Sequence, residues 1–120
     1  MGNVTKVSPL APAAFPDLPV IDGVRFATIA AGVKYQGRDD VMLADLAPGT
    51  TIAGTFTKSA TRAAPVLDCQ AKIGGPSDAG AALLVNSGNA NAFTGKGGSA
   101  AVAAITQTVA QPCGVPEPRG

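Results

Sequence analysis

Glycine and proline divide this chain into short segments, and their spacing limits which elements it can form. The first part of the chain carries Pro9, Pro12, Pro16 and Pro19, which exclude both a helix and the interior of a sheet. We expect residues 1–22 to form an extended N-terminal arm, and partial disorder of this arm stays open. The whole chain has 15 Gly and 10 Pro among 120 residues, which is typical of a folded but loop-rich protein.

Four segments after the arm have the residue pattern of strands. Alternation of side chains and an abundance of β-branched residues predict strands over residues 24–29, 41–46, 51–57 and 81–86. A hairpin turn at residues 35–38 would join the first two strands, because Gly37 is free to adopt a positive φ there. Several strands need further layers of structure to cover both faces of a sheet.

Two segments favour helices. Residues 61–73 suit either an extended segment or a short helix with Pro65 in its first turn, and we favour the helix. Apolar residues recur at helical spacing after Ser99, which is a suitable N-cap residue, and predict a second helix that runs to about Gln111. Pro112 and Gly114 would end this helix.

Charge and hydropathy exclude two classes of partner. Nine basic and eight acidic residues give a net charge of +1, and no run of like charge occurs. Binding to nucleic acid is therefore disfavoured, since it needs clustered Lys or Arg. The apolar stretches are far shorter than the ~20 residues that span a bilayer, and the N-terminus lacks a signal or transit pattern. We expect a cytoplasmic protein.

The chain contains no histidine and only two cysteines. A Ser–His–acid or Cys–His catalytic unit cannot be built from such a chain alone. Cys69 and Cys113 are far apart in sequence and do not form a CxxC pair, so we expect two reduced thiols and no metal site. We also expect no cofactor.

The segment from Asn86 to Gly98 is the richest in polar and flexible residues. It lies between a predicted strand and a predicted helix, and its Asn, Ser and Thr side chains supply directed hydrogen-bond donors and acceptors. Its glycines permit close approach of the backbone to another group. Such a loop is either the wall of a ligand pocket or a purely structural loop whose side chains hydrogen-bond to its own backbone.

Phosphate binding is an alternative function for the same loop. A P-loop would need Gly in place of Ala90 and Ser or Thr in place of Gly97, so that motif fails. Gly95 to Ala100 does match the G-x-G-x-x-A dinucleotide fingerprint, although it does not follow the strand directly. A nucleotide-binding α/β module that uses the Gly95–Ala100 loop is therefore the alternative.

A family resemblance rests on several blocks of sequence. Residues 86–95, Asn-Ser-Gly-Asn-Ala-Asn-Ala-Phe-Thr-Gly, resemble the NSGNAN-A-x-TG motif of the ornithine acetyltransferases, which are glutamate N-acetyltransferases of arginine biosynthesis. Residues 31–34 (AGVK), 56–57 (FT) and 63–66 (AAPV) resemble further family blocks in the same order. The resemblance covers about residues 23–114, with Ser59 where the family often has Asn and Phe93 where it often has Cys.

The resemblance implies a fold and an assembly. The fold class is α/β (α+β), a layered sheet-and-helix sandwich of the self-cleaving N-terminal-nucleophile-like type, with only part of it in this chain. Residues 23–120 would be the N-terminal part of an acetyltransferase α chain. A precursor of this family cleaves itself before a Thr and forms an α2β2 heterotetramer, so the partners would be the β chain and the rest of the α chain.

The resemblance also implies the chemistry. The family moves an acetyl group from N-acetylornithine to glutamate through an acyl-threonine intermediate, and some members also use acetyl-CoA. The nucleophilic Thr and the oxyanion-hole Thr-Gly are expected C-terminal to Gly120, so we expect no catalytic residue and no activity in this chain alone.

The candidates for the substrate pocket come from the polar loop. They would line the pocket or support it from behind through hydrogen bonds, and they are Asn86, Ser87, Gly88, Asn89 and Asn91. Arg62 could contact a substrate carboxylate, but an exposed turn residue is the simpler interpretation. Asp39 and Asp40 precede a strand and are expected to shape a turn rather than to act as a general acid.

Overall fold

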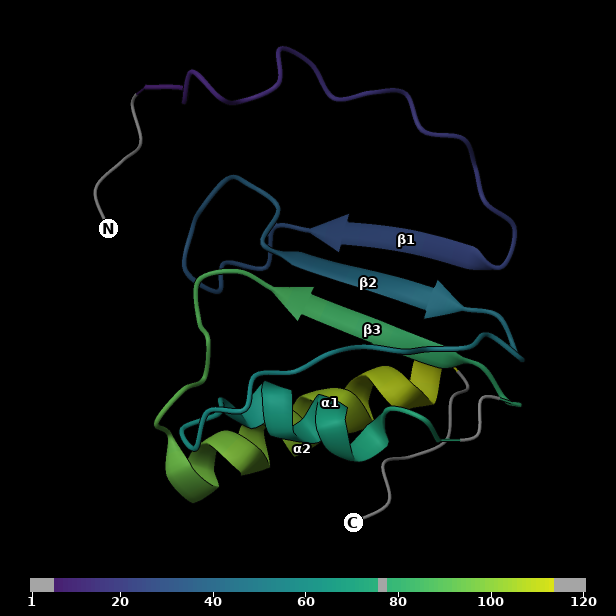
Figure 1. Cartoon of the computed structure of the whole chain (residues 1–120), viewed down its shortest axis with the longest axis vertical. Coiled ribbons are helices and arrows are strands. Elements are labelled where there is room, and N and C mark those ends of the chain that lie inside the picture. Colours follow the sequence, from purple (N-terminus) through teal and green to yellow (C-terminus); the bar gives the residue numbers. More distant parts are fainter. Residues whose placement is uncertain (1–5, 76–77, 114–120) are drawn as a thin grey trace.

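The computed structural model describes residues 6–75 and 78–113, with the side chains of the last two residues excepted. Three strands and two helices follow one another along the chain (Figure 1): β1 (Val24–Ile29), β2 (Val41–Leu46), α1 (Ala64–Lys72), β3 (Ala81–Asn86) and α2 (Gly95–Cys113). The sequence predictions for the three strands and for the short helix are confirmed. The described part of the arm, from Lys6 to Ile21, forms neither helix nor strand and is exposed.

The strands form one antiparallel sheet in the order β1-β2-β3. Cross-strand partners share a face of the sheet, and side chains alternate between the two faces along each strand. One face therefore carries apolar side chains with the single exception of Thr28. We call it the apolar face; its apolar residues are Val24, Phe26, Met42, Ala44, Leu46, Ala81, Leu83 and Val85.

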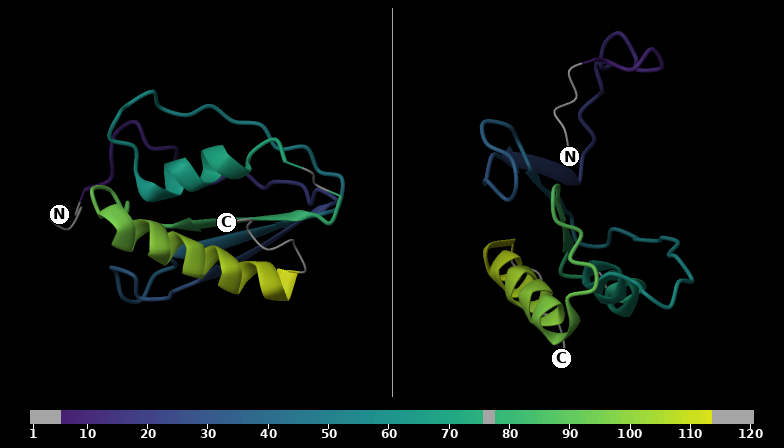
Figure 2. Two further views of the ribbon diagram at one scale, coloured as in Figure 1. Left: turned by 90° about the horizontal axis from the view of Figure 1, so that it is seen from below. Right: turned by 90° about the vertical axis from the view of Figure 1, so that its left-hand side faces the viewer.

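Both helices lie beyond the β3 edge of the sheet, one on each side of its plane (Figure 2). They contact each other, and α2 also contacts β3. Helix α1 starts with Pro65 in its first turn, where a missing N–H costs no intrahelical bond. An ion pair of 2.7 Å joins Lys72 to Asp68, four residues earlier. Within the described part of the chain, both helices therefore lie at the β3 side of the sheet, away from β1 (Figure 1).

The core of the described residues is small. Among the described side chains, those of residues 6–75 and 78–111, only Ala44 and Ala110 are buried and apolar. The side chain of Phe26, on the apolar face, is 70% exposed. A sheet with such an open face needs another layer against it, because large apolar patches on a folded protein mark contact surfaces.

One predicted strand is wrong. Residues 51–57 form no strand, despite their β-branched residues and alternating pattern. Both edges of β2, the strand that precedes this segment, are occupied by β1 and β3, so the segment cannot form a hairpin with β2. It instead runs beside α1, and a Cβ built on Gly54 would lie 3.1 Å from Cδ1 of Ile73.

The second helix differs from its prediction at both ends. It begins at Gly95, so Ser99 lies inside the helix and is not its N-cap, and it continues past Gln111 to Cys113, the last residue of the described range. Pro112 lies in the last turn. No helix in the described part of the chain is long and apolar enough to cross a membrane.

Candidate functional site

Asp40 stands at the corner of the sheet where both strand ladders end. Its backbone N–H donates to the Ile29 carbonyl at 3.1 Å, and its carbonyl accepts the Ser87 N–H at 2.9 Å. Its carboxylate accepts the N–H groups of Ala31 and Val33, each at 2.7 Å. The residue is only 5% exposed, although it carries a charge. Asp40 therefore joins the end of β1, the loop that follows it and the start of the polar loop.

The surroundings of Asp40 set its ionisation. Burial raises the pKa of the carboxyl group and is the largest single influence. Hydrogen bonds from the backbone N–H groups of Ala31, Val33, Lys34 and Asp40 itself lower it and together outweigh burial, so the pKa lies below its ordinary value. The carboxylate is an acceptor for a turn, as predicted, rather than a proton donor. Its neighbour Asp39 accepts the Thr28 hydroxyl at 2.6 Å.

The Asn side chains of the polar loop bond to the loop itself. The Asn86 side-chain amide donates to the Asn89 carbonyl at 3.1 Å. The Asn89 side-chain oxygen accepts the Asn91 N–H at 3.0 Å, and the Asn91 amide donates to the Gly98 carbonyl at 3.0 Å. These bonds fix the course of the backbone between β3 and α2. They fit the interpretation of a purely structural loop, while its role as the wall of a ligand pocket stays a prediction.

Asn91 also organises the start of α2. Its side-chain oxygen accepts the Thr94 hydroxyl at 2.6 Å, and its backbone carbonyl accepts the Ala64 N–H at 3.2 Å, which ties the loop to α1. Asn91 and Phe93 both have a positive φ, of 50° and 58°. Asn tolerates this conformation better than Phe does, and Phe93 is 86% exposed at the loop surface.

Two glycines of this region lie against other side chains. A Cβ on Gly88, whose φ is +93°, would lie 2.4 Å from the Cβ of Lys34. A Cβ on Gly98 would lie 1.8 Å from Oγ1 of Thr94 and 2.8 Å from Oδ1 of Asn91. Neither position has room for a side chain without a shift of its neighbours. Gly88 thus brings the loop after β1 and the polar loop into direct contact.

The structure brings the predicted candidates together in one loop but in different roles. Asn86, Asn89 and Asn91 form the hydrogen-bonded chain, while Ser87 and Gly88 face the loop after β1. Within the described residues, no hydrogen bond of the Ser87 hydroxyl is found. The sequence indicated that Asp40 shapes a turn but not that it binds Ser87, because its partner is distant in sequence and no local pattern marks the pair.

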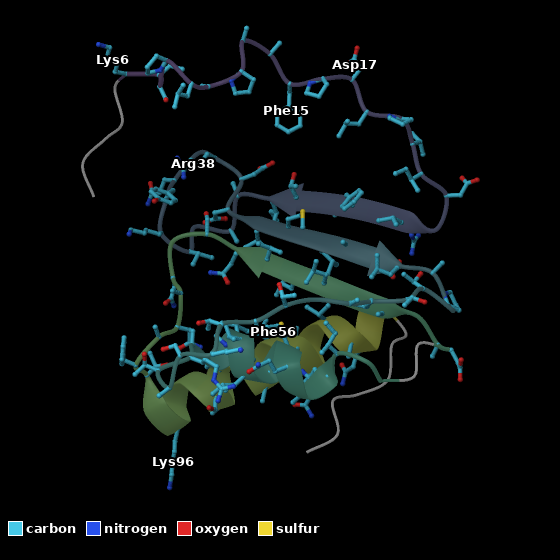
Figure 3. The ribbon with its side chains drawn as sticks, in the orientation of Figure 1. Lys6, Phe15, Asp17, Arg38, Phe56 and Lys96 are labelled. Carbon is cyan, nitrogen blue, oxygen red and sulfur yellow. The ribbon has the colours of Figure 1, made fainter. Side chains whose placement is uncertain are left out.

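The charged candidates lie at the surface. The Arg62 guanidinium donates to the Gln70 side chain at 2.8 Å, which fits the exposed-turn interpretation. Arg38 stacks on the Tyr35 ring, 3.8 Å from its centroid, in the loop between β1 and β2 (Figure 3). Cys69 is a free, exposed thiol, and Cys113 lies outside the described side chains. No group of three or more potential metal ligands occurs within the described ranges.

The nucleotide-binding alternative does not agree with the structure. Gly95 to Ala100 belong to the first turns of α2 and not to a loop that directly follows a strand. The preceding strand, β3, pairs antiparallel with β2, whereas dinucleotide-binding units have a parallel sheet. Lys96 points away from the rest of the molecule (Figure 3).

A pocket lies between the two helices, and it is lined by Ala64, Leu67, Asp68, Ser99 and Val102.

The fold and the loop geometry define a mixed α/β unit, with an antiparallel sheet and an internally hydrogen-bonded polar loop that leads into a helix. The ArgJ family model matches residues 25–119, and the chain belongs to the ArgJ family. It is 73% identical over 116 residues to the arginine biosynthesis bifunctional protein ArgJ of Ruegeria pomeroyi, which covers 97% of this chain and 28% of that protein. It is 60% identical over 96 residues to the protein of the same name from Nitrobacter winogradskyi, covering 78% of this chain and 23% of that protein.

A solved structure agrees with this assignment. The crystal structure of the arginine biosynthesis bifunctional protein argJ from Bacillus halodurans matches with a TM-score of 0.71 and 30% identity. The match covers 80% of this chain and 49% of that chain. The present chain spans about a quarter of the length of the Ruegeria and Nitrobacter relatives.

Proposed function

We propose that this chain is part of an acetyltransferase that moves an acetyl group from N-acetylornithine to glutamate in arginine biosynthesis. The observation that carries the proposal is the 73% identity, over 97% of the chain, to a protein named as the arginine biosynthesis bifunctional protein ArgJ. The polar loop from Asn86 to Gly98 supports the proposal because Asn side chains hydrogen-bond to its own backbone carbonyls. A held loop is suited to the wall of a pocket.

The reaction has two acyl-transfer steps. A threonine hydroxyl attacks the acetyl carbonyl of N-acetylornithine, the amide bond breaks, and ornithine leaves with the proton on its amine. The amine of glutamate then attacks the threonine ester, the ester C–O bond breaks, and the proton lost by the amine returns to the threonine oxygen as N-acetylglutamate leaves. The nucleophile, its α-amine as general base and the oxyanion-hole Thr-Gly would come from polypeptide outside these 120 residues. The present chain would contribute pocket wall, with Asn86, Ser87, Gly88, Asn89 and Asn91 near the acyl group.

The open sheet supports the finer fold assignment. A layered sandwich of the N-terminal-nucleophile-like type would place further strands or helices against the apolar face, where Phe26 and Leu83 are exposed at 70% and 48%. Those layers would come from the rest of the α chain and from the β chain of an α2β2 heterotetramer. We place this assembly in the cytoplasm. If it belongs to the family members that accept a second acetyl donor, that donor would be acetyl-CoA.

A chimera tests the proposed function. This chain is joined to the portion of the Ruegeria pomeroyi protein that lies beyond the matched residues, and the product is purified beside the complete Ruegeria protein. We expect the chimera to cleave itself into two chains and to form N-acetylglutamate from N-acetylornithine and glutamate. Gel mobility and chromatography of the products measure both results.

The complete Ruegeria protein is the control for the assay conditions. A chimera that is soluble and folded but stays uncleaved and transfers no acetyl group, while the control does both, would refute the proposed function. Replacement of the cleavage-site Thr by Ala in the chimera should abolish both cleavage and transfer, which shows that the measured activity belongs to the chimera and not to a contaminant.

A further inference from the structure

We infer that Asp40 is a positioning residue of the acetyl-transfer site, which fixes the polar loop by binding it and the loop after β1 at the same time. The inference rests on the proposed function for its catalytic meaning. Its structural part stands on the contacts of Asp40 alone. In this proposed role Asp40 does not contact the substrate and acts through Ser87 and Gly88.

Asp40 binds three segments with three different groups. The backbone N–H holds the end of β1 through Ile29, and the backbone carbonyl holds Ser87 at 2.9 Å. Its carboxylate accepts the backbone N–H of Ala31 on one oxygen and that of Val33 on the other, both at 2.7 Å. Bonds from a charged acceptor at this length are among the stronger hydrogen bonds in proteins. A displacement of Asp40 therefore moves all of these segments together.

The loop held by the carboxylate presses directly on the polar loop. The Cβ, Cγ and Cδ atoms of Lys34 lie within 3.3 Å of the position that a Cβ on Gly88 would occupy. Val33, whose N–H binds Asp40, is the residue before Lys34. The polar loop is thus held from two directions, by the Ser87–Asp40 bond and by the Lys34 stem against Gly88. Neither contact involves the Asn side chains that hold the loop from within.

Only a carboxylate satisfies this geometry. Both side-chain oxygens of Asp40 accept N–H groups, so an Asn at this position would turn its NH₂ group toward one of the donors. The unsatisfied N–H would remain in a site that is 5% exposed. The loop after β1 would shift to relieve this contact, and Lys34 would shift with it. A misplacement of about 1 Å in a group that shapes an active site can lower the rate by up to about a hundredfold.

The test uses the chimera with Asp40→Asn and, as a matched control, with Asp39→Asn. Asp39 is the adjacent residue, and it accepts one hydroxyl at the surface of the sheet. The amount of active enzyme is measured as the fraction of the nucleophile chain that N-acetylornithine acetylates, read by mass spectrometry. The turnover per acetylated site is measured separately. We expect Asp40→Asn to lower the turnover per site by ten- to a hundredfold, while Asp39→Asn leaves it within about twofold.

An activity-independent measurement accompanies these rates. Hydrogen exchange of the peptides that cover residues 30–34 and 86–91 should become faster by at least about tenfold in Asp40→Asn, while exchange within β1 and β2 stays unchanged. If Asp40→Asn lowers the acetylated fraction but not the turnover per site, the positioning role is refuted. If exchange rises in residues 30–34 but not in 86–91, the connection to the polar loop is refuted.

Two further outcomes are distinguishable. If the unsubstituted chimera transfers no acetyl group, the proposed function fails, and hydrogen exchange still decides whether Asp40 links the two loops. Should Asp40→Asn fail to fold, Asp40→Glu replaces it, since it keeps the charge and moves the carboxylate by one methylene. We expect Asp40→Glu to fold and to lose turnover per site by about tenfold; full turnover in that variant would overturn the inference.

Discussion

At the scale of single residues, Asp40 shows how backbone N–H groups of the described chain can hold a buried negative charge. Its carboxylate is satisfied by backbone N–H groups, which lie at fixed positions because they belong to one tight loop. Such bonds favour the charged form of a carboxyl group. The negative charge is therefore part of the folded structure at neutral pH.

The lowered pKa of Asp40 predicts a pH dependence of stability. The folded pKa lies below the ordinary value of 3.8 that applies to the unfolded chain, so the carboxylate favours the folded state above pH 3.8. This contribution is lost as the pH falls through the folded pKa. The urea midpoint of the chimera should exceed that of its Asp40→Asn version by a constant amount near neutral pH, and the gap should shrink below about pH 3.8. A gap that widens on acidification would contradict the assignment of the pKa shift.

The existence of the polar loop was predictable from the sequence, but its contacts with distant parts of the chain were not, and a role of its residues in a substrate pocket stays a prediction. A dense cluster of Asn, Ser and Gly between a strand and a helix indicated the loop from sequence alone, and its internal bonds are local enough to be expected. The bond between Ser87 and Asp40 depends on the alignment of β2 with β3. The contact of Lys34 with Gly88 depends on the same alignment. No property of the individual residues sets that register.

At the scale of elements, the fold was predictable where local pattern and available partners agree. Strands β1, β2 and β3, which pair in the sheet, match their predictions, and so does helix α1. Residues 51–57 have equal strand propensity but no free edge beside β2, and propensity alone does not supply a partner. Helix α2 starts early because hydrogen bonds of Asn91 and Thr94 organise its first turn, although the glycines there are poor helix formers.

Adjacent glycines in α2 make a matched pair of substitutions. A Cβ on Gly98 would lie 1.8 Å from the Thr94 hydroxyl, whereas nothing lies within 4 Å of a Cβ on Gly97. We expect Gly98→Ala to destabilise the chimera by about 1–3 kcal/mol, because Thr94 and Asn91 must move. Gly97→Ala should stabilise it by roughly 0.5–1 kcal/mol through its higher helix propensity.

Urea unfolding of the two variants measures both effects. The helix propensity gain is common to the two substitutions, so the difference between them isolates the contact with Thr94. Equal stability of the two variants would mean that the loop before α2 does not pack on Gly98 in the folded protein.

At the scale of the whole molecule, most large apolar side chains are partly or fully open to solvent. Phe26, Ile29 and Leu83 are exposed at 70%, 60% and 48%, and Ala44 and Ala110 are the buried apolar residues of the described part of the chain. A core of this size supplies little hydrophobic stabilisation. The sheet therefore depends on neighbouring structure for its stability, which accords with a chain that spans 28% of its Ruegeria relative.

This exposure predicts a difference between the chain alone and the chimera. The 120-residue chain should bind the apolar dye ANS, unfold without a cooperative transition and associate in solution, since its apolar face is uncovered. The chimera should bind several-fold less dye per chain. Fluorescence and light scattering test both. Cooperative unfolding of a monomeric 120-residue chain would instead favour an independent interaction module.

The neutral partners of Asp40 also govern how the site responds to ionic strength. Ion pairs such as Arg25 with Asp45 lie at the surface, where dissolved ions screen them. The Asp40 carboxylate is enclosed by peptide groups at 2.7 Å, a distance at which mobile ions cannot intervene. Added salt should therefore weaken the Arg25–Asp45 ion pair more than the hydrogen bonds from Asp40 to the neighbouring loop.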